Sequence, residues 1–106
     1  MAGYPFRNSM FSHGLEPRTV ELIGYLIDHD QAWCDRDTVI RSLGWIDELM
    51  WNRGEKNGAS CDARISFAFH YCQANAYLPR FGYCVGMRQN GQRKLYRIHE
   101  IAEEAA

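Results

Sequence analysis

Apolar residues recur every three or four positions near the start of the chain, which is the spacing of one face of a helix. The set is Val20, Leu22, Ile23, Leu26 and Ile27. Pro17 precedes them and suits a first helical turn, because that turn needs no backbone N–H donor. The pattern predicts an amphipathic helix over residues 17–29.

A short extended piece, Trp33 and Cys34, separates this helix from a second one. Asp35 is the predicted N-cap, because its carboxylate can accept hydrogen bonds from the free N–H groups of a first turn. The predicted inward-facing residues of the second helix are Val39, Ile40 and Leu43. Gly44 stands where a glycine commonly ends a helix.

The third helix is expected over residues 62–76, capped by Ser60 or Asp62. One or two helical turns over 46–52 and a polar, glycine-rich loop over 52–60 precede it. The predicted buried stripe is Ile65, Ala68, Phe69, Cys72 and Ala76. The remaining faces then carry Arg64, Ser66, Phe67, His70, Tyr71, Gln73 and Asn75.

Residues 81–99 alternate between apolar and polar and centre on Asn90-Gly91, a strong hairpin signal because a type I′ turn needs positive φ at both central residues. That turn pairs Met87 with Lys94, Val85 with Tyr96 and Tyr83 with Ile98 on an apolar face. It pairs Arg88 with Arg93 and Cys84 with Arg97 on a basic face. Like charges would therefore oppose each other near the tip.

The organisation is one α+β domain over residues 16–100, preceded by an extended arm over 1–15 and followed by a short acidic tail over 101–106. A chain of 106 residues with 46% apolar residues can bury one ordinary core. No apolar run approaches the roughly 20 residues that span a bilayer, and the N-terminus lacks the pattern of a secretory signal. We therefore expect a cytoplasmic protein without membrane contact.

The four cysteines, Cys34, Cys61, Cys72 and Cys84, have no metal-knuckle spacing, so we expect reduced thiols and neither a metal nor another cofactor. Charge is unevenly distributed along the chain. Residues 1–61 carry six Lys/Arg against nine Asp/Glu, whereas residues 62–99 carry six Lys/Arg against one Asp. Such segregation favours a polyanionic partner.

Three stretches resemble the winged helix-turn-helix family: Ser42-Leu43-Gly44-Trp45, Asn75-Ala76-Tyr77-Leu78 and Lys94-Leu95-Tyr96-Arg97-Ile98. The order of three or four helices followed by a C-terminal β-hairpin wing over residues 17–99 is similar to that family. The stretch 45–60 is longer than the family's usual turn. The resemblance implies that the third helix enters the major groove of double-stranded DNA and that the hairpin lies along an adjacent groove or the backbone.

The residue types suit that function. Arg64 can pair with guanine, Gln73 or Asn75 can pair with adenine, and Ser66 and His70 can reach phosphates or base edges. The hairpin cations Arg88, Arg93, Lys94 and Arg97 would neutralise phosphates. The alternative is that these residues form ordinary solvated faces of a helix and a hairpin.

Two function hypotheses follow. The first is a transcriptional regulator of bacterial or phage type that binds DNA as a homodimer. The second is a winged-helix-like protein-interaction module, such as a phage-encoded inhibitor of a host protein complex. Candidate contacts for the second are Phe67, Tyr71 and Trp51. The alternative is that the aromatic residues of the third helix pack against the 45–60 segment or the arm.

Catalytic motifs are absent from the sequence: there is no GxSxG, no phosphate-binding glycine loop and no HExxH. A Cys–His nucleophile is conceivable, with His70 and either Cys61 or Cys84 as the pair. We do not expect an enzyme.

Overall fold

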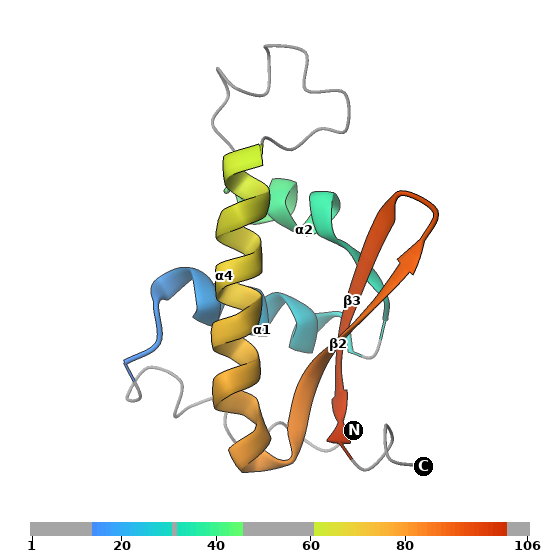
Figure 1. The fold of residues 1–106 in the computed structure, drawn as a ribbon. Helices are drawn as coiled ribbons and strands as arrows, with labels where there is room; N and C mark the ends of the chain where they lie inside the picture. Colours follow the sequence, from blue (N-terminus) through green and yellow to red (C-terminus); the bar gives the residue numbers. More distant parts are fainter. Residues whose placement is uncertain (1–13, 31, 46–60, 102–106) are drawn as a thin grey trace.

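Three α-helices and a three-stranded antiparallel sheet make up the part of the chain that the computed structural model describes, residues 14–30, 32–45 and 61–101. The elements are α1 (Pro17–Asp28), β1 (Cys34–Asp35), α2 (Arg36–Ser42), α4 (Cys61–Tyr77), the 3-10 helix η2 (Leu78–Phe81), β2 (Tyr83–Asn90) and β3 (Arg93–Glu100). The strand order is β1-β3-β2. The tip of the β2–β3 hairpin reaches the level of α2 and of the beginning of α4 (Figure 1). The fold is therefore α+β and ends in a hairpin, as expected.

The first two helices form where the sequence predicts them. Pro17 occupies the first turn of α1, and four of the five apolar residues of the predicted face are buried, Val20 being partly buried. The Asp35 carboxylate caps α2 by accepting a hydrogen bond of 3.1 Å from the Thr38 backbone N–H. Gly44 follows α2 with a φ of +73°, a conformation that favours glycine.

The third predicted helix exists as α4, but its buried face differs from the prediction. The buried residues are Ala63, Phe67, His70, Ala74 and Tyr77. The predicted stripe faces outward instead, with Ile65 63% and Phe69 55% exposed. Both sets repeat with helical spacing, so periodicity could not distinguish them. The Phe67 ring is accommodated between Trp45 and Tyr96, at centroid distances of 6.4 and 4.8 Å.

The C-terminal hairpin forms with the predicted faces but with a different register. Asn90 pairs with Arg93, so the turn residues are Gly91 and Gln92, and Gly91 has a φ of +65°. Each predicted cross-strand pair is therefore displaced by two residues. A shift of two keeps every side chain on its face, so alternation could not exclude it. The predicted opposition of Arg88 and Arg93 is wrong, because Leu95 lies opposite Arg88.

The core lies between α1, α4 and the inner face of the sheet. Val85 and Ile98 form a cross-strand pair on that face, and both are buried. No helix in the described ranges has the length and apolarity needed to cross a membrane. The expected arm up to residue 13, the turns and loop over 46–60, which include Trp51, and the tail after residue 101 lie outside the described residues.

Candidate nucleic-acid interface

A hollow of about 350 Å³ lies between α2, the beginning of α4 and the hairpin tip. Five cationic and two acidic side chains contribute to its wall. The lining residues are Asp35, Arg36, Asp37, Thr38, Arg41, Arg64, Gln92, Arg93 and Lys94. Three cations predicted to contact DNA, Arg64, Arg93 and Lys94, are thus brought together from α4 and the hairpin.

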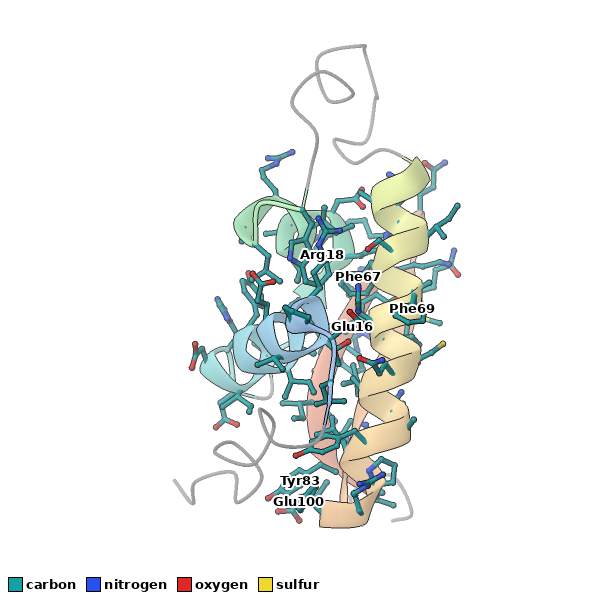
Figure 2. All side chains as sticks on the ribbon, turned by 90° about the vertical axis from the view of Figure 1, so that its left-hand side faces the viewer. Glu16, Arg18, Phe67, Phe69, Tyr83 and Glu100 are labelled. Carbon is teal, nitrogen blue, oxygen red and sulfur yellow. The ribbon has the colours of Figure 1, made fainter. Side chains whose placement is uncertain are left out.

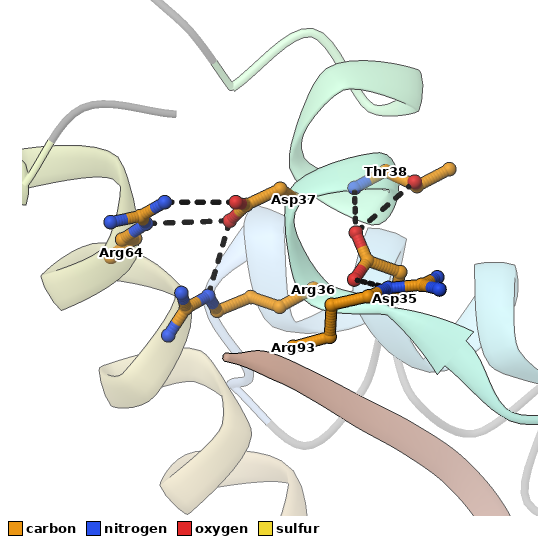
Figure 3. Close-up of polar contacts among 6 residues, drawn as sticks. All are labelled: Asp35, Arg36, Asp37, Thr38, Arg64 and Arg93. Atoms are coloured by element: carbon orange, nitrogen blue, oxygen red, sulfur yellow. Dashed lines mark hydrogen bonds and ion pairs between the residues drawn. The ribbon is translucent and has the colours of Figure 1, made fainter. Parts of the chain in front are cut away.

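Asp37 organises one side of this hollow. Its carboxylate accepts two hydrogen bonds from Arg64, from Nη2 at 2.9 Å and from Nε at 3.4 Å (Figure 3). It also accepts a hydrogen bond of 3.2 Å from Nε of Arg36. One carboxylate therefore orients two guanidinium groups from different helices, and the cluster retains an excess positive charge.

Asp35 organises the other side. Besides capping α2, it accepts a hydrogen bond of 3.1 Å from Nε of Arg93 (Figure 3). Burial acts to raise the pKa of the Asp35 carboxyl, but the hydrogen bonds from Arg93 and Thr38 outweigh it and hold the pKa below its usual value. The side chain of Arg93 stays 65% exposed, so the ion pair fixes this cation at the surface.

The outer face of the hairpin, which points away from the helices, carries an aromatic–arginine cluster. The guanidinium carbons of Arg88 and Arg97 lie 4.8 and 4.9 Å from the ring centroid of Trp33. Nε of Arg97 is buried without a hydrogen-bond partner. Gly86 leaves room for the neighbouring His99 ring, because a Cβ there would lie 2.7 Å from Nε2 of His99, whereas its distance of 3.8 Å to the Trp33 ring would be an ordinary contact.

The helix residues predicted to read bases mostly make contacts within the protein. Ser66 accepts a hydrogen bond of 3.1 Å from Arg18. Gln73 accepts hydrogen bonds through Oε1 from the Glu16 backbone N–H at 3.0 Å and from the Thr19 hydroxyl at 2.6 Å. Asn75 binds the backbone N–H and carbonyl of Val85, at 2.7 and 3.0 Å. Each of these side chains joins α4 to a neighbouring element.

His70 is buried beside Thr19, with Nδ1 2.8 Å from the hydroxyl oxygen. The Thr19 proton is directed to Gln73, so the hydroxyl oxygen accepts from Nδ1–H of a neutral imidazole. Burial lowers the pKa of His70, and the nearby charge of Arg18 adds to this effect, while Glu16 and Glu21 oppose it. His70 is therefore part of the core and does not face a groove.

The aromatic residues of α4 that were proposed as protein contacts also pack within the protein. Phe67 is 1% exposed, so its assignment as a surface contact is wrong. Tyr71 is half-buried and packs edge-on against Tyr96 at a centroid distance of 5.0 Å. Packing against the core therefore accounts for Phe67 and for much of Tyr71. Trp45, which packs against Phe67, is buried as well.

Of the two pairs considered for nucleophilic chemistry, His70 with Cys84 does not form, because His70 lies beside Thr19 and Trp45, and the side chain of Cys61 lies outside the described residues. Cys84 instead has its sulfur 3.5 Å from Nε2 of His99. Nδ1 of His99 lies 3.0 Å from the Glu100 carbonyl oxygen and donates to it, so Nε2 is the acceptor toward the thiol. Within the described part of the chain, no group of three or more His, Cys, Asp or Glu side chains could hold a metal ion.

Three contributors to this region were not predicted from the sequence: Trp33, Arg36 and Arg41. With the hairpin cations and Arg64, they form what we call the cationic surface: Arg36, Arg41, Arg64, Arg88, Arg93, Lys94 and Arg97, with Trp33 between two of its members. Among the described residues that line the hollow, Asp35 and Asp37 are the acidic ones, against five of these cations. Both missed arginines come from the acidic half of the sequence, so linear charge counts concealed them.

Comparisons with known proteins add no assignment: neither the family models, nor the curated proteins, nor the solved structures that were searched contain a match to this chain.

Proposed function

We propose that this protein binds double-stranded DNA through the cationic surface, with the β2–β3 hairpin acting as the wing of a winged-helix domain. The observation that carries the proposal is the gathering of five cations from α2, α4 and the hairpin tip around two carboxylates, with Arg88 and Arg97 adding two further cations beside Trp33. The helix–strand–helix–helix–hairpin order and the strand order β1-β3-β2 support the winged-helix assignment. We further propose that the protein acts as a transcriptional regulator.

The contacts expected from this surface are to phosphates. Arg88 and Arg97 have no carboxylate partner among the residues that the structure describes, and a phosphate would supply the missing counter-charge. Arg64 and Arg93 are already oriented by Asp37 and Asp35, which lowers the entropy cost of fixing them on an anion. Phosphate contacts position a protein on DNA without reading its sequence. The exposed face of α4 is apolar, so base reading by this helix is not part of the proposal.

Salt-dependent DNA binding tests the proposal. Fluorescence anisotropy with a random-sequence duplex between about 50 and 200 mM salt should show steep salt dependence. The Arg88→Ala/Arg93→Ala double variant should weaken binding and reduce the salt slope by about one to two. Arg18→Ala/Arg80→Ala is the matched control, because it removes the same charge outside the cationic surface. Equal slopes for the two double variants would contradict the proposal.

A second candidate function is a protein-interaction module, for instance an inhibitor encoded by a phage that docks on a host complex. The exposed Ile65 and Phe69 on α4 favour this candidate. Phe69→Asp should leave DNA affinity unchanged under either function, so the distinguishing measurement is binding to the partner protein. If α4 is the docking site, Phe69→Asp should lose that binding, whereas the Arg88→Ala/Arg93→Ala variant should keep it.

A further inference from the structure

The outward face of α4 carries an apolar stripe with no covering element among the described residues. It consists of Ile65, Ala68, Phe69, Cys72 and Ala76, all of which are exposed. Phe67 points from α4 toward the rest of the fold, whereas Phe69 lies on a different side of the helix (Figure 2). Single apolar residues at a protein surface are common, but a contiguous exposed apolar stripe usually marks a contact surface.

We propose that this stripe is the interface of a homodimer in which two copies of α4 pack antiparallel about a two-fold axis between residues 70 and 71. The large side chains Ile65 and Phe69 lie in the first half of the stripe, and the small Cys72 and Ala76 lie in the second half. An antiparallel pair with this centre places Ile65 against Ala76 of the second copy and Phe69 against Cys72 of the second copy. Each large side chain then meets a small one, which is the self-complementarity that a two-fold interface requires.

Charge also favours the antiparallel arrangement. The stripe itself contains no charged residue, so no like charges meet across the contact. Arg64 lies between six and seven residues from the proposed centre, or about 10 Å along the helix, so the two copies of Arg64 would be about 20 Å apart. This separation exceeds the Debye length of about 8 Å at physiological salt. A parallel pair would instead bring the two cationic surfaces side by side.

The area of the stripe sets the expected strength of the dimer. From the exposed fractions of Ile65 and Phe69 and the smaller residues beside them, each copy contributes roughly 350 to 400 Å² of apolar surface. Two copies would bury about 700 to 800 Å², less than the roughly 1,200 to 2,000 Å² of a stable interface. We therefore expect a weak, reversible association that rises with protein concentration, and not a permanent dimer. This inference rests on α4 alone and does not depend on DNA binding.

Sedimentation equilibrium of the full chain over about 1 to 500 μM tests the interface, a range that spans micromolar dissociation constants. The wild-type mass should rise toward that of a dimer with concentration. Phe69→Asp should weaken association by at least about tenfold, because it places a carboxylate in an apolar contact. Met87→Asp is the control, since Met87 is 45% exposed on β2, away from the stripe. Circular dichroism of both variants verifies that the helices are retained.

The register has its own test. Ala76→Ile should weaken the dimer, because two large side chains would meet, and adding Ile65→Ala should restore it by exchanging large and small positions. Failure of the second substitution to restore association would overturn the antiparallel register. A wild-type protein that stays monomeric over the whole concentration range would overturn the dimer. This result is expected if another segment or another protein covers the stripe. A dimer that Phe69→Asp leaves unchanged would overturn the interface.

Discussion

The two apolar faces of α4 look alike in sequence but have opposite environments. The buried face, with Phe67 and His70, meets Thr19 on α1 and Tyr96 on β3. The outward face, with Ile65 and Phe69, contains residues that are just as apolar. What distinguishes the faces is the polar side chains beside them: with Phe67 pointing inward, Gln73 binds Thr19 and Asn75 binds Val85. Hydrophobicity makes a helix face suitable for burial, and the polar neighbours decide which face is buried.

The largest contrast should come from truncating one aromatic residue on each face. Phe67→Ala should lower the free energy of unfolding by about 3–5 kcal/mol, because it leaves a cavity between Trp45 and Tyr96. Phe69→Ala should change it by less than about 0.5 kcal/mol, since the side chain is exposed. Urea denaturation at low protein concentration measures both values. Equal losses would mean that the two faces are equally buried.

A smaller effect should follow from removing the hydroxyl that links α1 to the buried face. Thr19→Val leaves His70 and Gln73 without their shared partner and should cost about 1–3 kcal/mol. Ser66→Ala is the control, because it removes a hydroxyl from an exposed contact with Arg18 and should cost less than about 0.5 kcal/mol. If the two variants lose the same stability in urea, the buried network does not select the face.

The smallest effect should be a pH dependence of the unfolding free energy that arises from His70 on the buried face. Because burial lowers the pKa of His70 below 6.5 in the folded state, the unfolded state binds its proton first. The stability contributed by neutral His70 is complete above about pH 6.5 and is lost as the pH falls toward the lower folded value. The unfolding free energy of wild type should therefore decrease more between pH 7 and 5 than that of His70→Gln. Parallel profiles would show that His70 does not carry this dependence.

Local signals predicted most of the secondary structure. Pro17, the Asp35 cap and Gly44 set helix ends through contacts within a few residues, and these predictions are confirmed. The rotation of α4 was not predictable in this way, because it depends on Thr19, which is 51 positions from His70. The hairpin register was missed because a shift of two preserves both faces.

In the candidate interface, too, the cations that come from nearby sequence positions were predicted, and those that tertiary packing brings together were not. The hairpin cations were identified from sequence, since a hairpin brings nearby residues together. Arg36 and Arg41 were missed because only the packing of α2 against α4 and the hairpin tip places them in the same hollow. The linear charge count assigned them to an acidic half of the chain, whereas in three dimensions they extend a basic surface.

Asp35 joins the beginning of α2 to the hairpin, because its two oxygens serve Thr38 and Arg93 separately (Figure 3). A phosphate that draws Arg93 away removes one of the two partners that hold the Asp35 carboxylate in place, so the cap on the Thr38 amide should open more often. Hydrogen exchange of that amide depends on how often the cap opens. The Thr38 amide is therefore an internal reporter, in the second helix, of what the hairpin tip is holding.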